Sequence, residues 1–289
     1  MSRGIENAES GEDATDGAYL VPGLERGLRI LAEFSRKEPV LSAPEISRRL
    51  EIPRTTVFRL LQTLEQMGFV ERTNREASFQ PSVSALHLGF DYLNSLPVVR
   101  HGMPALQRLR DRIGLTVHLV IRDRTDIVYA ARAEGPSVRL GNFKVNLGTR
   151  LPAHATVHGQ VLLGDLDIAD LTKLYSGPDL PRFSPHTPST VIELHERILA
   201  ASRQGYGISE SYFESGVSAV SAPVRCKTGN IVAVVAVTIG RSKIDGDLVR
   251  DLLIHDVIST ANEISDFLHG EYPARRIARG EEEMVSALR

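Results

Sequence analysis

The chain has 289 residues, of which 42% are hydrophobic and 24% are charged, and its formal net charge is −2. This length suits two domains, and the composition is that of an ordinary globular protein. The near-neutral charge excludes a generic binder of polyanions, so any nucleic-acid surface must be local. A single cysteine, Cys226, excludes an internal disulfide. No apolar run reaches the roughly 18 residues that a membrane-spanning helix needs.

The N-terminal stretch is acidic and rich in Ser, Gly and Ala, which predicts a disordered lead over residues 1–19. It lacks a basic region followed by an apolar core, so we expect no signal peptide and a cytoplasmic location. Residues 22–34 then favour a helix. One of its faces carries four apolar residues, Leu24, Leu28, Leu31 and Phe34.

Residues 42–68 are typical of two helices joined by a short turn. Ser42 and Glu45 have the spacing of a capping box, which starts the first helix. Pro53 cannot continue that helix, because it lacks a backbone N–H. Gly68 stops the second helix. The apolar stripe of this second helix consists of Val57, Leu60, Leu61, Leu64 and Met67.

The outward face of the second helix is polar and rich in hydrogen-bonding groups. Thr55, Arg59 and Gln62 lie opposite the apolar stripe, and Arg54 and Thr56 flank the first turn. Such side chains can bind base edges in a major groove. The pattern therefore favours a helix-turn-helix that binds DNA, with an ordinary amphipathic surface helix as the alternative.

A short β-hairpin is predicted next, over residues 69–72 and 77–80, with a polar turn between them. Three helices followed by a hairpin indicate a winged helix-turn-helix DNA-binding domain over residues 20–81. We expect Arg72 and Arg75 on the wing to reach phosphate or the minor groove, and Ser42 to contact phosphate. A solvated turn is the alternative interpretation for the two arginines.

Residues 82–96 predict a linker helix that is apolar on two faces. Val83, Leu86, Phe90 and Leu93 lie on one face, and Leu88, Tyr92 and Leu96 lie on the other. A helix of this kind needs burial on both sides. We therefore expect a homo-oligomer that forms through the linker.

Residues 97–270 predict an α+β domain with a mostly antiparallel sheet flanked by helices, followed by a charged tail over residues 271–289. The expected helices span 97–114, 152–163, 167–175, 189–204 and 247–268. The expected strands span 116–122, 126–131, 137–143, 206–209, 217–224 and 230–239.

These blocks together resemble the IclR-type bacterial transcriptional regulators over roughly residues 21–267. In the first domain the resemblance is carried by LERGL at 24–28, IPRTTVFRLLQTL at 52–64 and MGFV at 67–70. In the second it is carried by GTRLPAHAT at 148–156, RQGYG at 203–207, and GV at 216–217 leading to APV at 222–224. Matches in the same order in both domains are specific, whereas one block alone would be weak.

The resemblance implies a winged helix-turn-helix joined by a linker helix to a GAF-like effector-binding domain. It also implies dimers or tetramers on pseudo-palindromic operators, a small organic acid as effector, repression or activation as output, and no cofactor. Residues 88–93 and 151–163 look most similar to the branch that controls aromatic-acid catabolism through the β-ketoadipate pathway.

Carried over position by position, the resemblance implies an effector pocket beside the helix that follows the LPAHAT motif. Its expected residues are Val157, His158, Ser209, Ala219, Ala236 and Thr238. The start of that helix offers N–H groups to a carboxylate. Ser209 and Thr238 can donate hydrogen bonds, and the alanines leave space.

The chain departs from the family pattern at several pocket positions. It has His158-Gly159-Gln160 where many members have a small residue followed by Gly-Lys, and Ser209-Glu210 where an acidic pair is common. Tyr212 stands in place of a family glutamate, while Ala219, Ala236 and Thr238 replace a Cys and two Ser. A roomier, less polar pocket follows, which favours an aromatic or larger carboxylate over a two- or three-carbon acid.

Other interpretations of single residues are weaker. His154 and His158 are four apart on the expected helix, but no nearby Cys, Asp or Glu completes a metal site. Arg122, Arg132 and Arg139 could pair with a carboxylate or lie at the surface. The sequence at 207–211 lacks the last glycine of a nucleophile elbow, and Cys226 lacks an evident base. An enzyme is therefore not expected, and an interaction module with a degenerate winged helix is the remaining alternative.

Overall fold

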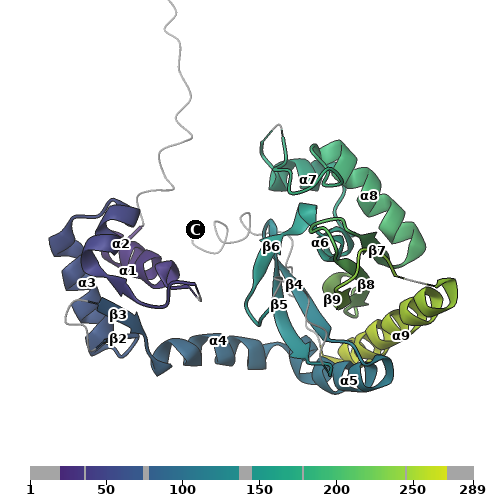
Figure 1. The fold of residues 1–289 in the computed structure, drawn as a ribbon, viewed down its shortest axis with the longest axis horizontal. Coiled ribbons are helices and arrows are strands. Elements are labelled where there is room, and N and C mark those ends of the chain that lie inside the picture. Colours follow the sequence, from purple (N-terminus) through teal and green to yellow (C-terminus); the bar gives the residue numbers. More distant parts are fainter. Residues whose placement is uncertain are drawn as a thin grey trace, which may run out of the picture. The chain divides into compact units, whose positions relative to one another are not determined.

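A computed structural model gives the fold of residues 20–35, 37–73, 78–136, 145–177, 179–244 and 246–271 (Figure 1). The chain forms two compact units, and the division falls between Tyr92 and Leu93. Four sequence predictions concern segments outside the described residues. They are the acidic lead, the hairpin turn with Arg75, the strand at 137–143 with Arg139, and the charged tail.

The first unit is a winged helix-turn-helix, as predicted. Its elements are α1 (Pro22–Glu33), β1 (Leu41–Ser42), α2 (Ala43–Leu50), α3 (Arg54–Gln66), β2 (Val70–Arg72) and β3 (Ser78–Pro81). The strands form an antiparallel sheet in the order β1-β3-β2. Ser42 caps α2 by accepting a hydrogen bond of 3.4 Å from the Glu45 backbone N–H. Gly68 follows α3 with φ +79°, a conformation that suits glycine.

Helix α1 buries only part of the face that the sequence pattern indicated. Ile30 and Gly27 are buried, and Leu31 and Phe34 pack against the same core. Leu24 and Leu28, by contrast, are 64% and 58% exposed. They lie at the side of the helix next to the line that reaches the core.

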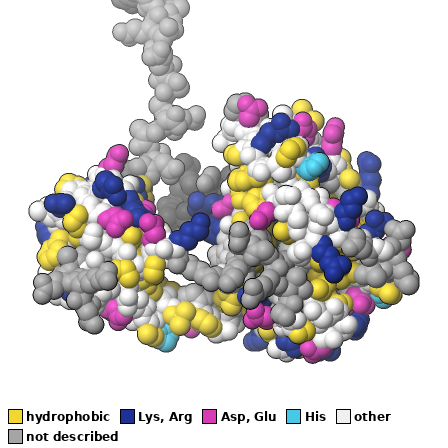
Figure 2. Space-filling model, viewed as in Figure 1, with side chains coloured by type: hydrophobic (Ala, Val, Ile, Leu, Met, Phe, Trp, Pro, Cys, Tyr) yellow, Lys and Arg dark blue, Asp and Glu magenta, His cyan; other side chains and the backbone are white. Residues whose placement is uncertain are grey.

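Helix α4 (Val83–Ser95) connects the two units and leaves most of its apolar side chains exposed. Leu93 and Leu96 are half-buried and pack against the core of the second unit. Figure 2 shows hydrophobic side chains gathered where α4 lies. The exposed ones are Val83, Leu86, Leu88, Phe90 and Tyr92.

The second unit is built on a six-stranded antiparallel sheet in the order β6-β5-β4-β9-β8-β7. Its strands are β4 (Val117–Asp123), β5 (Asp126–Ala133), β6 (Arg150–Pro152), β7 (Gly207–Glu210), β8 (Ser218–Arg225) and β9 (Ile231–Ile239). Helices α5 (Pro97–Ile113) and α9 (Asp247–Glu271) cover one face (Figure 1). Helices α6 (Val157–Leu162), α7 (Ile168–Leu174) and α8 (Val191–Gln204) lie on the other. The predicted α+β architecture is confirmed.

Strand periodicity divides the core of this unit between the two faces of the sheet. On β9, Val235 and Val237 point into the core under α5 and α9, whereas Val234 and Ala236 point into the core under α6. This alternation follows from the two-residue repeat of a strand. It explains why β9 is apolar along its whole length, because both of its faces are covered.

The single helix predicted over residues 152–163 is wrong. Pro152 ends strand β6, residues Ala153–Ala155 form a 3₁₀ turn, and Thr156 is extended with φ −122° and ψ 147°. Helix α6 begins only at Val157, because the Thr156 side chain caps it by accepting a hydrogen bond of 3.1 Å from Gly159 N–H. His154 and His158 therefore do not share one helical face.

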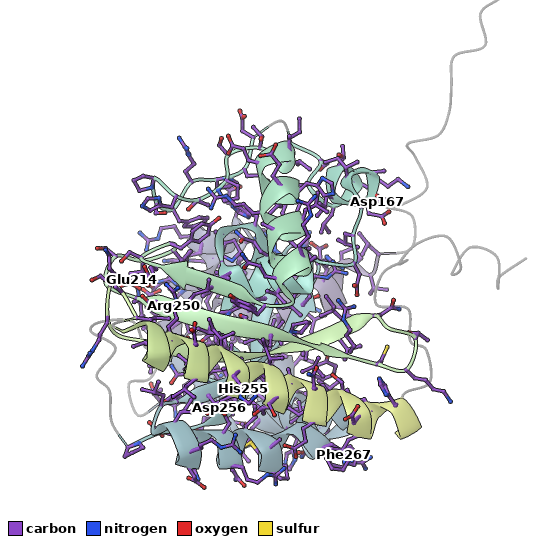
Figure 3. All side chains as sticks on the ribbon, turned by 90° about the vertical axis from the view of Figure 1, so that its right-hand side faces the viewer. Asp167, Glu214, Arg250, His255, Asp256 and Phe267 are labelled. Carbon is purple, nitrogen blue, oxygen red and sulfur yellow. The ribbon has the colours of Figure 1, made fainter. Side chains whose placement is uncertain are left out.

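Ion pairs join α5 to α9 on the face away from α6. Arg112 donates a hydrogen bond of 2.9 Å to the Asp256 carboxylate, and Arg108 pairs with Glu263. Figure 3 shows Asp256 on α9, beside α5.

None of the helices that the structure describes is long and apolar enough to cross a membrane.

Candidate functional site

The first candidate site is the outward face of α3, which the fold leaves open. Arg54, Thr55, Arg59 and Gln62 are exposed, and Thr56 is half-buried. The opposite side of the helix is anchored in the core through Val57 and Leu61, among others. The structure thus holds five of the eight predicted DNA-contacting residues on one short helix whose orientation in the unit is fixed.

Arg72 has a different environment from the one expected for a free wing residue. Its Nε donates hydrogen bonds of 3.0 and 3.1 Å to the two Glu65 carboxylate oxygens. Its guanidinium lies 5.7 Å from the centroid of Phe58 and 5.1 Å from that of Phe79. The sequence did not predict these contacts, which fasten the wing strand to α3.

The second candidate site is a pocket between the sheet and α6 in the second unit. Its cavity volume is about 40 Å³. Five of the six predicted effector residues line it: Val157, His158, Ser209, Ala219 and Thr238. Ala236 does not line the pocket. It is fully buried in strand β9, where it pairs with His118 on β4 and with Ser221 on β8.

The pocket walls also include residues that the sequence did not indicate. Strands β5 and β6 contribute Tyr129 and Leu151, and the loop after β7 contributes Tyr212, Phe213, Glu214 and Val217. Figure 3 shows Glu214 at one end of the sheet. Leu151 and Val217 stand in blocks that carry the family resemblance, and Tyr212 is a departure from the family pattern, but none of them was predicted as an effector contact. Together these groups make a largely apolar pocket with scattered hydrogen-bonding groups, which suits a small organic ligand.

The polar groups of the pocket are buried and mostly uncharged. His158 Nδ1 lies 2.6 Å from Ser221 Oγ, and Thr238 Oγ1 has no hydrogen-bond partner among the described residues. Burial lowers the pKa of His158 to about 4 and raises that of Tyr129. Both side chains are therefore neutral at pH 7.

Tyr212 fixes the loop that closes one side of the pocket. Its phenolic oxygen accepts a hydrogen bond of 2.6 Å from Gln160 Nε2 on α6. The Arg197 guanidinium on α8 lies 5.0 Å from the centre of its ring. The Ser184 hydroxyl donates to its backbone oxygen. Three separate segments therefore hold Tyr212, two through its side chain and one through its backbone.

His154 belongs to an aromatic cluster outside the pocket lining. Its ring lies 5.8 Å from Tyr175 and 5.9 Å from Phe183, and its Nε2 is 2.9 Å from Pro181 O. Within the described ranges, no group of three His, Cys, Asp or Glu side chains could hold a metal ion. The structure therefore assigns His154 a packing role.

A winged-helix DNA-binding unit followed by a ligand-sensing α+β unit defines a ligand-controlled transcriptional regulator. Comparison with family models gives the same answer for both units. Residues 23–74 match the IclR helix-turn-helix domain, and residues 90–266 match the bacterial transcriptional regulator IclR C-terminal domain. The chain belongs to the IclR family of bacterial transcriptional regulators. Its members are DNA-binding regulators and not enzymes.

Individual relatives are similar along most of their length. The Pca regulon regulatory protein of Pseudomonas putida is 27% identical over 251 residues, which cover 87% of this chain and 85% of the relative. The p-hydroxybenzoate hydroxylase transcriptional activator of Acinetobacter baylyi is 27% identical, and the match covers 91% of this chain and 97% of the relative. The transcriptional repressor AllR of Klebsiella pneumoniae is 29% identical, and the match covers 79% of this chain and 86% of the relative.

Solved structures share the fold. A transcriptional regulator from Rhodococcus sp. RHA1 has a TM-score of 0.75 at 29% identity, covering 88% of this chain and all of that one. An IclR homologue from Microbacterium hydrocarbonoxydans, solved in complex with 4-hydroxybenzoate, has a TM-score of 0.74 at 20% identity. The match covers 86% of this chain and 100% of the homologue's chain.

Proposed function

We propose that this regulator controls genes for the breakdown of aromatic carboxylic acids, and that such an acid is its effector. The single observation that carries the proposal is the pocket between α6 and the sheet, with its apolar walls and neutral hydrogen-bonding groups. The relatives from P. putida and A. baylyi are named for the Pca regulon and for p-hydroxybenzoate hydroxylase. The M. hydrocarbonoxydans homologue binds 4-hydroxybenzoate.

The chemistry of the pocket walls supports an aromatic ligand over a two- or three-carbon acid. Tyr129, Phe213 and Leu151 offer flat or branched apolar surface that a benzene ring can cover. Ala219 leaves space on the sheet side. Thr238, Ser209 and His158 supply hydrogen bonds to polar substituents.

For DNA binding, we expect a homo-oligomer on a pseudo-palindromic operator in the cytoplasm. The exposed apolar side chains of α4 support contact with a second subunit through the linker. Two copies of α3 would then enter successive major grooves. Ser42, Arg54, Thr55, Thr56, Arg59, Gln62, Arg72 and Arg75 are the proposed contacts to bases and phosphates.

Effector binding would act on DNA binding through the linker. A ligand shifts such an equilibrium only by binding one state better than the other. We propose that the occupied pocket favours one setting of α4, and hence one spacing of the two α3 helices. The relatives include both a repressor and an activator.

Two measurements test this function. Gel-shift titration with the DNA upstream of the protein's own gene should give a sequence-specific complex that weakens with salt. Calorimetry should show binding of benzoate or 4-hydroxybenzoate and much weaker binding of pyruvate or glyoxylate. Absence of a specific complex at several salt concentrations contradicts DNA regulation. Tight binding of glyoxylate or pyruvate without binding of aromatic acids contradicts the effector class.

A further inference from the structure

The sheet face beneath α6 holds buried polar groups without hydrogen-bond partners. Both ring nitrogens of His118 lack a partner among the described residues, and so does Thr238 Oγ1. His118 is 1% exposed and Thr238 is 5% exposed. Folded proteins satisfy nearly all buried polar groups. Thr238 lines the pocket, so its unpaired hydroxyl indicates a polar group of a ligand at this place.

His118 extends the polar region behind the pocket wall. It lies opposite Ala236 on β9 and Arg132 on β5. Its ring centroid is 5.1 Å from that of Tyr129, which in turn is 6.1 Å from that of His158. Tyr129 thus lies in contact with two buried imidazoles, both on the side of the sheet that faces α6.

The His158 imidazole can gain a proton without moving. Its Nδ1 is 2.6 Å from Ser221 Oγ, and a serine hydroxyl either donates or accepts a hydrogen bond by rotating its proton. The residue also lines the pocket. The ring is therefore anchored through Nδ1 at a position that a ligand in the pocket can reach.

A carboxylate in this pocket meets no permanent positive charge. Among the described residues, no lysine or arginine lines it, whereas Glu214 does. Arg132 lies behind the wall, opposite His118, and its Nη2 already pairs with Glu134 at 2.9 Å. Burying an uncompensated charge is costly. An anion bound here needs a positive charge that the empty pocket does not contain.

We propose that His158 supplies this charge: an aromatic monocarboxylate binds against His158 and Thr238 together with one proton, which the imidazole takes from solvent. This inference rests on the proposed function, in which the pocket takes an aromatic carboxylate. The ligand enters as its anion, the proton comes from the buffer, and imidazole becomes imidazolium. No covalent bond forms or breaks in the ligand.

The groups around His158 favour this proton transfer only when the ligand is present. The ionisable groups that line the pocket with it are Tyr129, Tyr212 and Glu214. Behind them, His118 lies beside Tyr129 and opposite Arg132, and Arg197 lies against Tyr212. Burial lowers the pKa of His158 to about 4 and of His118 to about 3. The charges of His158 and Arg132 further lower the pKa of His118, so His158 is the better acceptor. An anion in contact with an imidazole raises its pKa.

Calorimetry of the full-length wild-type protein tests this with benzoate and 4-hydroxybenzoate as probes. Titrations in buffers of different ionisation enthalpy measure the protons taken up per ligand. We expect close to one proton at pH 6, and an affinity that falls as the pH rises to 8, by up to about ten-fold per pH unit. Binding without proton uptake at pH 6 overturns the inference and leaves the proposed effector class standing. Binding of neither probe contradicts both.

Two variants assign the proton to a residue. His158→Gln keeps a hydrogen-bonding group near Ser221 but cannot titrate, so binding should lose its proton uptake and most of its pH dependence. His154→Gln is the matched control, because His154 lies outside the pocket lining, and it should behave as wild type. Uptake retained in folded H158Q overturns the assignment. If H158Q does not fold, the uptake measured for the wild-type protein still decides whether binding is proton-linked.

Discussion

Gln160 and Tyr212 form a hydrogen bond of 2.6 Å across the pocket wall, from the amide of α6 to the phenolic oxygen of the loop after β7. Both residues are departures from the family pattern, and the structure brings them together. Gln160 is only 6% exposed, so its end of the hydrogen bond is buried. An uncharged pair here holds the loop without placing a fixed charge in the pocket.

Removing the phenolic hydroxyl tests this pair. In Tyr212→Phe the buried Gln160 amide loses its partner, so we expect the free energy of unfolding to fall by about 1–3 kcal/mol. Ligand affinity should fall as well, because the loop forms part of the pocket wall. The double variant Gln160→Leu with Tyr212→Phe leaves no unpaired group and should recover most of the stability. Denaturant unfolding of both proteins gives the comparison, and equal losses would contradict this account.

Gly159 is required by the close approach of α6 to the 3₁₀ turn before it. A Cβ at this position would lie 2.0 Å from the Ala153 carbonyl oxygen. Gly159→Ala should therefore destabilise the second unit by several kcal/mol or prevent it from folding. Gly102→Ala is the control in the same unit, since its Cβ would meet ordinary contacts of 3.5 Å or more. A wild-type melting temperature for G159A would show that the packing at this turn is misjudged.

The two buried histidines make the stability of the second unit depend on pH. The folded-state pKa of His118 is about 3 and that of His158 about 4, below the unfolded value of about 6.5. The unfolded chain thus binds more protons, and stability falls as the pH drops below about 6.5. Each histidine contributes up to about 1.4 kcal/mol per pH unit until its folded-state pKa is reached. Unfolding curves measured between pH 7.5 and 5 should show the free energy of unfolding falling as the pH drops. The fall should be smaller in H158Q than in the wild-type protein.

The exposed apolar face of α4 predicts that charge placed there breaks the oligomer. Leu86→Glu puts a carboxylate where we expect a second subunit, so sedimentation at micromolar concentration should show smaller species than wild type. Asn94→Glu, at another exposed position of the same helix, is the control and should not change the assembly. A monomeric wild-type protein at this concentration would contradict assembly through the linker.

Arg59 is the proposed base contact whose loss is easiest to interpret. Arg59→Ala should weaken specific operator binding by about 1–3 kcal/mol if the side chain binds a guanine. A phosphate contact would instead weaken binding to all sequences and reduce the salt slope by about one. Arg203→Ala on α8, an exposed arginine of the second unit, serves as control. Unchanged operator affinity in R59A would remove this residue from the interface.

The sequence predicted most of the elements because their periodicities were strong. The apolar stripe of α3, the paired strands β4 and β5, and the β8–β9 hairpin all have one clear repeat and clear stop signals. The helix predicted over residues 152–163 was wrong because the composition of this segment suits a helix along its whole length. Pairing of β6 with β5 holds residues 150–152 in the sheet, which depends on tertiary structure. The Thr156 cap and the close contact of Gly159 with Ala153 are local, and with them the helix begins only at Val157.

The pocket was predictable only in part, for the same physical reason. Val157, His158, Ser209, Ala219 and Thr238 were carried over by position from the family resemblance, which spans roughly residues 21–267. Tyr129 reaches the pocket because β5 lies beside β4 in the sheet, and Leu151 because β6 lies beside β5. The pairing of Arg72 with Glu65 likewise depends on how the wing folds back on α3, and no local pattern encodes it.

The most direct test of the central claim is a fluorescence-anisotropy titration of operator DNA with the full-length protein, with and without saturating 4-hydroxybenzoate or benzoate. We expect a sequence-specific complex whose affinity or stoichiometry changes when one of these acids is present. We also expect the change to be reduced in H158Q, while DNA binding without ligand is kept. A specific complex that neither acid alters would contradict the coupling of the α6 pocket to α3.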